Sequence, residues 1–263
     1  MKSLIFLTLI IFQTSIHAFT LNNNVGLVFP MDEVKINIAD SSCVNVGIDA
    51  NELLSIAKDA VDEYWNKTPT SRFKMRQGSI ITAGTHSNDG KICLPDDNTC
   101  IAGGGVPPVS SDILIVCNQN SDNFPAGTGV LAITVPNNIS GDKIVGSVVL
   151  LNDTATTYLK NKSRSEKVSV IAHELGHAFG LGHSPVKDSL MYYSTIDLRT
   201  NLGADDMDGI SYLYPKNQSV TCGSTDLNSK NKPDQVIGLL LGIVLSLVAF
   251  KSYERYLKLR PRF

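Results

Sequence analysis

The sequence predicts one α/β domain over residues 19–215. Two observations carry this prediction. Short runs rich in valine, isoleucine and leucine recur as buried strands do, and two longer segments carry helix-opening residues. A segment of this length suits a single domain with one hydrophobic core. We expect strands near residues 34–38, 72–76, 113–117, 130–135 and 145–151.

Two helices are expected around these strands. The first begins after Asp49, with Glu52 three residues later, and runs to about Trp65. The second follows the last strand, where Ser163 and Glu166 stand at the spacing of a capping box. Apolar residues then recur every three or four positions, which is typical of a helix with a buried face. They are Val168, Ile171, Leu175 and Phe179.

The second helix carries a pattern suited to binding a catalytic zinc ion, HELGHAFGLGHS at residues 173–184. His173 and His177 are four residues apart, so both side chains lie on one helix face and can bind one ion. Glu174 follows the first ligand directly and is suited to act as a general base. Gly180 allows the chain to leave the helix sharply and to return His183 as a third ligand. Three protein ligands leave a fourth zinc position for water.

This motif, followed by SLMYY at residues 189–193, resembles the metzincin metalloproteases. The serine directly after the third histidine, Ser184, resembles the pattern of the matrixin branch. The segments 129–132 and 202–215 resemble that branch as well. The resemblance implies a zincin fold, in which a twisted mixed sheet carries an active-site helix and a C-terminal helix. It also implies that Met191 lies beneath the zinc, and that an extended peptide substrate pairs with a sheet edge between residues 130 and 151.

Tyr193 departs from the matrixin pattern. It stands two residues after Met191, as in the astacin and serralysin turns, where the tyrosine approaches the zinc or the oxyanion. One interpretation gives Tyr193 a catalytic role. The other is that Tyr192 and Tyr193 pack in the loop that shapes the substrate pocket, since a tyrosine hydroxyl is also a common structural hydrogen-bond partner.

Two features of related proteases are missing from the sequence. Matrixins are commonly kept latent by a PRCGxPD pro-domain motif, and this sequence contains none, so it gives no evidence of cysteine-switch latency. The structural zinc of vertebrate matrixins needs histidines ahead of the active helix, and residues 87–172 contain no histidine. We therefore expect one catalytic zinc and no second zinc. The sequence does not decide whether calcium binds.

Residues 1–18 resemble a secretory signal peptide, with Lys2, an apolar run and a small residue at Ala18. The alternative, a retained membrane helix, suits the short apolar run less well. Residues 216–235 are rich in polar residues and are expected to form a flexible linker.

An apolar run at residues 236–250 precedes a basic tail at 251–263. We interpret the run as a membrane anchor with a cytoplasmic tail, which places the catalytic domain outside the cell. At 1.5 Å per residue the run spans about 22 Å, short of a hydrocarbon core of about 30 Å. Two alternatives stay open: a sorting signal that is removed, leaving a secreted or surface-attached enzyme, and a buried core helix.

Five cysteines in an exported chain indicate disulfides. Cys43, Cys93, Cys100 and Cys117 fall in the domain and permit three pairings. The turn-like segment between Cys93 and Cys100 favours that pair, which leaves Cys43 with Cys117. Cys222 is then the odd cysteine, suited to an intermolecular disulfide, a processing step or a free thiol.

The sequence as a whole predicts a zinc metalloendopeptidase that cleaves internal peptide bonds of extracytoplasmic proteins. Its partners would be a protein or peptide substrate and, through residues 236–250, a membrane. The balance of 23 basic and 25 acidic residues gives no reason to expect nucleic-acid binding. One rival function is a surface binding protein that has lost activity, against which the intact Glu174 argues. A second rival is a zinc hydrolase that acts on a non-peptide bond.

Overall fold

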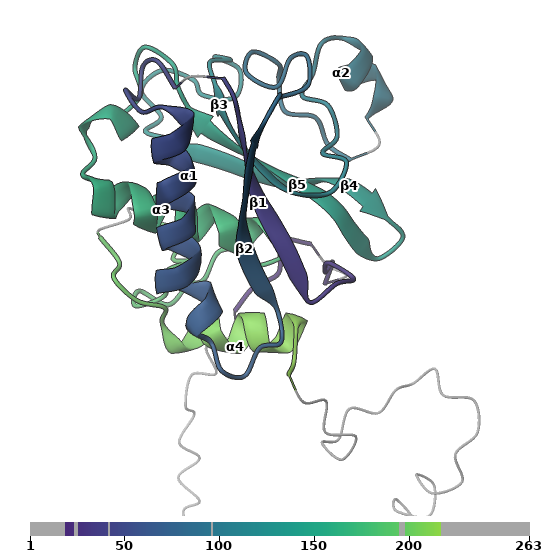
Figure 1. Ribbon diagram of the computed structural model, residues 1–263, viewed down its shortest axis with the longest axis vertical. Helices are drawn as coiled ribbons and strands as arrows, with labels where there is room; N and C mark the ends of the chain where they lie inside the picture. The colour runs from purple at the N-terminus through teal and green to yellow at the C-terminus, as the bar shows by residue number, and fades with distance from the viewer. Residues whose placement is uncertain (1–18, 24–25, 42, 96, 195–197, 217–263) are drawn as a thin grey trace, which may run out of the picture. The chain divides into compact units, whose positions relative to one another are not determined.

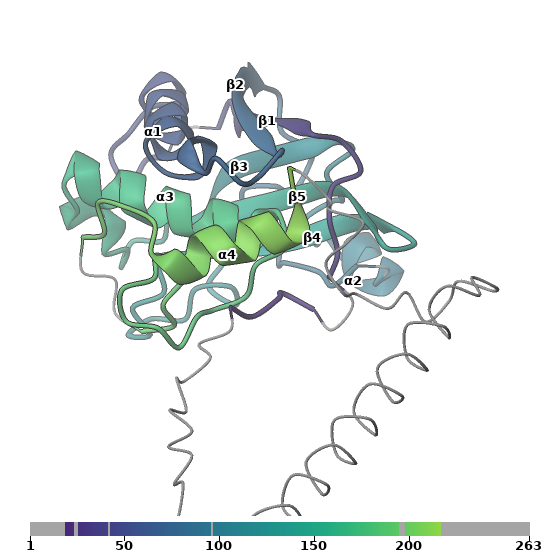
Figure 2. The same cartoon turned by 90° about the horizontal axis from the view of Figure 1, so that it is seen from below.

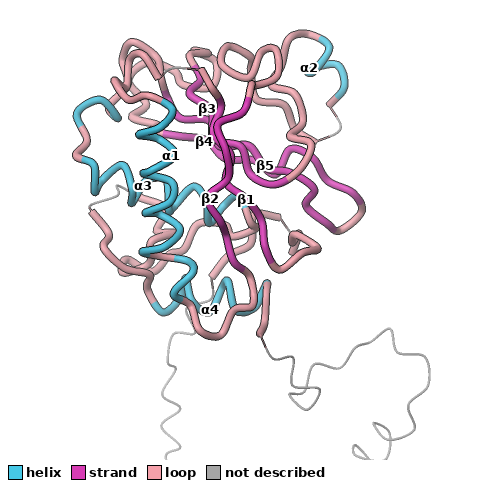
Figure 3. The backbone as a smooth tube through the Cα atoms, in the orientation of Figure 1, coloured by secondary structure: helices cyan, strands magenta, loops and turns pink. Residues whose placement is uncertain are grey.

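The structure, a computed structural model, describes residues 19–23, 26–41, 43–95, 97–194 and 198–216. These residues form a five-stranded sheet with helices packed against it (Figures 1 and 3). The strands are β1 (Glu33–Ala39), β2 (Lys74–Ile81), β3 (Asp112–Asn118), β4 (Ala132–Ser140) and β5 (Lys143–Asn152). The helices are α1 (Ala50–Glu63), α2 (Asn98–Ala102), α3 (Arg164–Ala178) and α4 (Ala204–Leu213), with short 3-10 turns at Trp65–Lys67 and Leu159–Asn161.

The sheet has the strand order β2-β1-β3-β5-β4. Strands β2, β1, β3 and β5 run parallel to one another. Strand β4 runs antiparallel to β5 and forms one edge of the sheet. Helices α1 and α3 lie side by side against the sheet, and α4 lies below α3 in the view of Figure 1 (Figures 1 and 2). The expected twisted mixed sheet with an active-site helix and a C-terminal helix is therefore confirmed. The expected peptide-binding edge corresponds to β4.

An aromatic cluster fixes α3 against the rest of the domain. Trp65 and Phe179 meet edge to face with ring centroids 4.7 Å apart, and Phe73 stacks on Tyr214 at 4.1 Å. The indole Nε1 of Trp65 donates a hydrogen bond of 2.7 Å to the carbonyl of Ala172, one residue before His173. These side chains are fully buried, so core packing holds the C-terminal half of the helix that carries the motif.

Two strands differ from their expected bounds. The strand expected at 130–135 is β4, which continues through Pro136 to Ser140. Proline is tolerated there because β4 is an edge strand and its register shifts between Pro136 and Asn138. The strand expected at 72–76 is β2, which continues to Ile81. It also lies at an edge, where exposed polar residues need not interrupt pairing with β1.

The two disulfides join Cys43 to Cys117 and Cys93 to Cys100, with Cα atoms 5.3 Å and 5.8 Å apart. The favoured pairing is thus confirmed. The first bond closes a long loop and ties β3 to the segment after β1. The second bond holds the short helix α2 in the loop between β2 and β3, a helix that the turn-like sequence did not predict.

The chain divides into two units, Met1–Gln218 and Ser219–Phe263. The expected signal peptide at 1–18, the anchor at 236–250, the tail at 251–263 and all of the linker except Lys216 lie outside the described residues. Within the residues that are described, no helix is both long enough and apolar enough to cross a membrane.

Candidate metal centre

Helix α3 begins with the expected capping box. The amide of Glu166 donates to Ser163 Oγ at 3.3 Å, and the amide of Ser163 donates to Glu166 Oε2 at 2.8 Å. Lys162, whose Nζ lies 2.9 Å from Glu166 Oε1, and the Ser163 amide lower the pKa of the Glu166 carboxyl to about 2. The start of the helix is therefore fixed by its own sequence, which sets the register of the histidines ten residues further on.

The helix ends where Gly180 turns the chain. Gly180 has φ of 121°, a conformation that glycine adopts at little cost. A Cβ at this position would lie 2.5 Å from the carbonyl oxygen of Leu27. The turn brings the amide of Leu181 to the carbonyl of Gly176 at 2.9 Å, and it returns His183 to the face of the helix that carries His173 and His177. The expected role of glycine at this position thus has a steric as well as a conformational basis.

The imidazoles of His173, His177 and His183 converge, with one ring nitrogen of each within 4.8 Å of the others. The Nε2 atom of His177 lies 3.2 Å from Nε2 of His173 and 3.2 Å from Nε2 of His183. Two nitrogen ligands on one tetrahedral zinc, each at 2.0–2.1 Å, stand about 3.3 Å apart. The spacing of these nitrogens therefore fits a single ion.

Hydrogen bonds fix the tautomers of two of these histidines. Nδ1 of His173 lies 2.7 Å from the carbonyl oxygen of Leu190, and Nδ1 of His177 lies 2.8 Å from that of Leu181. A carbonyl oxygen only accepts, so each Nδ1 carries the proton and each Nε2 presents a lone pair. Two lone pairs 3.2 Å apart repel each other unless a cation lies between them. The donor set is therefore suited to a metal ion.

Burial favours the neutral form of the His177 and His183 imidazoles. Burial, together with the neighbouring His173, lowers the pKa of His177 to about 3. The pKa of His183 is lowered for the same two reasons. A neutral imidazole is the form that binds a metal, so at neutral pH His177 and His183 can take an ion without first losing protons.

Glu174 is buried beside the histidines, and burial raises the pKa of its carboxyl. Its Oε2 accepts a hydrogen bond of 2.5 Å from Thr134 Oγ1 on the edge strand β4. A carboxylate with a raised pKa is suited to exchange a proton near neutral pH. Sequence reasoning did not identify Thr134, because nothing in the local sequence shows which residue of β4 would face the helix.

Met191 is buried against α3, where a Cβ on Gly176 would lie 2.3 Å from its Sδ atom. The turn around it is held by the first residues of α4. Asp206 accepts from the amides of Leu190 at 2.6 Å and Met191 at 3.1 Å, while Asp205 accepts from Ser184 Oγ at 2.5 Å. The resemblance noted in the sequence included both aspartates, but their role in holding the turn could not be derived from it.

The side chain of Tyr193 is 62% exposed, and its ring lies 4.7 Å from that of Tyr192. Its backbone amide donates to the carbonyl of Ser184 at 3.2 Å. A hydrogen bond between the two tyrosine hydroxyls raises the pKa of Tyr192. Both residues line the pocket beside the histidines, so the catalytic and the pocket-shaping interpretations of Tyr193 both stand.

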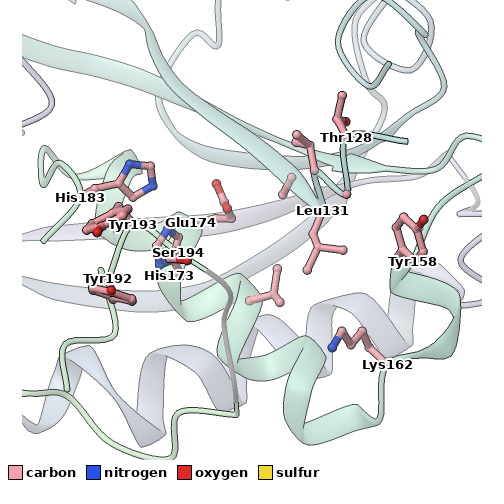
Figure 4. Close-up of a pocket in the computed structure, with 14 residues that line it drawn as sticks. Thr128, Leu131, Tyr158, Lys162, His173, Glu174, His183, Tyr192, Tyr193 and Ser194 are labelled. Carbon is pink, nitrogen blue, oxygen red and sulfur yellow. The ribbon is translucent and has the colours of Figure 1, made fainter. Parts of the chain in front are cut away.

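A cleft runs past the histidines along β4. On one side a cavity of about 670 Å³ adjoins His173, Glu174 and His183 and extends toward Tyr158 and Lys162 (Figure 4). On the other side a cavity of about 290 Å³ adjoins Glu174, His177 and His183. The two cavities give an extended chain room on both sides of the metal centre.

The first residues of the domain brace the loop that carries His183. Leu21 pairs with Leu181 in an isolated antiparallel bridge, the amide of Asn22 donates to Gly180 at 2.9 Å, and Thr20 accepts from Gly182 at 2.8 Å. Two side chains of this segment reach backbone carbonyls of the histidines. Asn22 donates to that of His177 at 2.9 Å, and Thr20 donates to that of His183. The sequence offered no signal for these contacts.

The fold and the site together define a class. A helix that carries two histidines and a glutamate, a glycine turn to a third histidine, and a buried methionine turn are the features of metzincin metalloproteases. The family model for matrixin matches residues 110–215. The chain therefore carries a matrixin-like metalloprotease catalytic domain.

Curated relatives match parts of this domain. The chain is similar to metalloendoproteinase 2-MMP of Arabidopsis thaliana, 42% identical over 72 residues, which are 27% of this chain and 19% of that protein. It is 34% identical to matrix metalloproteinase-18 of Xenopus laevis over 115 residues, 41% of this chain and 23% of the relative. Karilysin of Tannerella forsythia is 27% identical over 157 residues, 57% of this chain and 33% of the relative. The chain thus spans a third or less of each of these relatives.

Proposed function

We propose that this protein is a zinc-dependent endopeptidase in which His173, His177 and His183 bind the zinc. The observation that carries the proposal is the pair of Nδ1 hydrogen bonds to the carbonyls of Leu190 and Leu181, which turns two Nε2 lone pairs toward each other. Zinc bound there supplies Lewis acidity, which polarises a peptide carbonyl and acidifies water. Zinc dependence of the matrixin family supports the choice of metal.

Glu174 is the proposed general base. Its buried carboxylate takes a proton from the attacking water and returns that proton to the leaving amine. Thr134 holds one carboxylate oxygen, so the proton passes through a group of fixed orientation. Gly180 and Met191 are structural in this proposal: the first turns the chain toward His183, and the second packs beneath the histidines.

The substrate is proposed to be an extended peptide that adds to the edge strand β4. One side of β4 pairs with β5, while the cavities that adjoin the histidines are lined by residues from 128 to 134. A cleft that continues on both sides of Glu174 suits an internal bond of a chain better than a terminal one. This favours an endopeptidase over a zinc hydrolase of a small non-peptide ester.

The decisive experiment measures the zinc content and the peptide-library cleavage of the full chain beside its Glu174→Gln variant. We expect one zinc per chain in both, cleavage of internal bonds by the wild type, and a loss of activity of about 10²–10⁴-fold in the variant, the range that a general base supplies. A folded chain that binds no zinc would refute the proposal. Zinc binding without cleavage in either form would instead favour a binding protein.

The remaining proposals rest on the sequence. We propose domain bounds of 19–215, export directed by residues 1–18, and a membrane anchor at 236–250 that holds the catalytic domain outside the cell. Membrane fractionation of cells that express the full chain and a form ending at residue 235 tests the anchor. If both forms are equally soluble, residues 236–250 do not hold the protein in a membrane.

A further inference from the structure

The larger cavity beside the metal centre has a charged far end. Its lining includes the apolar side chains of Val130, Leu131 and Val170. Lys162 and Tyr158 lie at the end away from His183 (Figure 4). A ligand that enters past the histidines therefore has apolar side chains along the cavity and a cation at its far end.

Lys162 keeps donor capacity for such a ligand. Its Nζ lies 2.9 Å from Glu166 Oε1, and its side chain is 30% exposed. An ammonium group has three donor protons, so the bond to Glu166 leaves two for a ligand. Glu166 is itself occupied by the capping box, since its other oxygen accepts from the Ser163 amide at 2.8 Å. Lys162 is thus held in position by a partner that is fixed to the helix.

The position of the cavity relative to β4 sets which substrate residue would fill it. The cavity adjoins residues 128–132, before and at the start of β4, whereas the smaller cavity adjoins residues 132–134 further along the strand. Antiparallel pairing is slightly more stable per residue than parallel pairing, and a peptide that adds to β4 in this way runs from the end of β4 toward its start. The residue that follows the cleaved bond then reaches the cavity that contains Lys162.

We infer that Lys162 is a specificity-determining residue, which selects substrates whose residue after the cleaved bond has a long side chain ending in a hydrogen-bond acceptor, glutamate or glutamine. This inference rests on the proposed endopeptidase function. A side chain of this length lays its methylene groups along Val130, Leu131 and Val170 and places its polar end at the ammonium group. A charged end that is partly removed from water gains more from Lys162 than it would on an open surface.

The test uses the zinc-loaded full chain and two peptides that differ only in the residue after the cleaved bond, glutamate or methionine, with the cleaved bond identified by mass spectrometry. We expect Lys162→Met to lower the ratio of kcat/KM for the glutamate peptide to that for the methionine peptide at least tenfold. Lys162→Arg should largely keep the ratio. Lys160→Met is the matched control, because Lys160 is an exposed lysine two residues away that does not line the cavity.

A second variant separates specificity from helix capping. Glu166→Gln removes the carboxylate partner of Lys162 and weakens the capping box, but it leaves the ammonium charge. If Lys162 acts on the substrate, this variant keeps or raises the preference for glutamate. If Lys162 acts only by supporting α3, the two variants shift the ratio alike, and the inference is overturned. A ratio unchanged within twofold in Lys162→Met overturns it too, whereas absence of cleavage by every form refutes the endopeptidase function itself.

Discussion

The side-chain amide of Asn22 donates a hydrogen bond of 2.9 Å to the backbone carbonyl of His177. This contact joins the first residues of the domain to a proposed zinc ligand 155 residues away in the sequence. The backbone of the same segment pairs with the loop that leads from Gly180 to His183. The geometry of the metal centre therefore depends on a short segment that contributes no ligand and no catalytic group.

We predict that Asn22→Ala weakens zinc binding without unfolding the domain. A lost hydrogen bond of this kind costs about 1 kcal/mol, which corresponds to about a fivefold change if the whole cost falls on the zinc-bound form. Competition with a chromophoric chelator measures the affinity. Asn51→Ala, an exposed asparagine on α1, is the control and should bind zinc as the wild type does. Equal affinities for the two variants would show that Asn22 does not position the site.

Gly180→Ala is expected to destabilise the domain more than a change of conformational preference alone explains. Gly127 is the matched control, because its φ is also positive, at 80°, and a Cβ there would contact nothing within 4 Å. Gly127→Ala pays only the backbone cost of about 1 kcal/mol. At Gly180 the added Cβ would also lie 2.5 Å from the Leu27 carbonyl oxygen. We therefore expect Gly180→Ala to lower the free energy of unfolding by about 2–4 kcal/mol in total, as measured by urea denaturation. Equal losses would show that Leu27 moves aside freely.

Asp206→Asn should destabilise the turn around Met191. The buried carboxylate accepts from the amides of Leu190, Met191 and Gly203 at 2.6, 3.1 and 2.7 Å, and these bonds use both of its oxygens. Asparagine replaces one of the two oxygens by an NH₂ group, which donates and cannot accept. We expect a loss of about 2–3 kcal/mol in unfolding free energy together with weaker zinc binding. Asp208→Asn, at an exposed position of α4, should change neither property. Wild-type behaviour of Asp206→Asn would remove Asp206 from the support of the site.

The metal-free protein should lose stability as the pH falls below about 6.5. His177 has a pKa of about 3 in the folded chain, whereas an unfolded histidine titrates near 6.5. Between these two values the unfolded state binds a proton that the folded state does not, so the free energy of unfolding decreases as the pH falls. Over the whole interval this amounts to at most about 5 kcal/mol. Urea denaturation of the chelator-treated chain between pH 7.5 and 5 measures the first part of this loss, about 2 kcal/mol.

Bound zinc should suppress the loss of stability at low pH only while it stays bound, because protons and metal compete for the same Nε2 atoms. His177→Gln supplies the comparison, since glutamine does not titrate. The variant is expected to have a flatter stability profile between pH 7.5 and 5. Parallel profiles for the two metal-free chains would mean that other groups cause the acid sensitivity.

The ligands of the site were more predictable from sequence than its supports. His173, His177 and Glu174 are close in the chain and share one helix, so 3.6-residue periodicity places them, and the Ser163 to Glu166 capping box fixes where that helix begins. Thr20, Asn22, Thr134 and Asp206 reach the site through long-range contacts. No local pattern encodes such contacts, because each depends on how strands and loops far apart in sequence come together.

The bounds of β4 differ from expectation for a related reason. Pro136 followed by two asparagines is a local signal for the end of a strand. The strand continues because its position at the sheet edge tolerates a missing donor and a shifted register. Edge or centre is a property of the sheet and not of the segment, so the sequence of β4 alone could not decide it.

Thr134→Val should move the acid limb of the pH-rate profile to higher pH. The hydroxyl of Thr134 donates to Glu174 and lowers the pKa of that carboxyl, against the raising effect of burial. Without this donor the ionised form is less stable, so its pKa rises and the base is lost at a higher pH as the solution is acidified. Valine keeps the shape of threonine on β4, which isolates the hydrogen bond. The measurement is kcat/KM between pH 5 and 8, with Thr156→Val, at an exposed position, as the control. An acid limb that does not move, or one that moves to lower pH, would mean that Glu174 is not the titrating base or that Thr134 does not bind its ionised form.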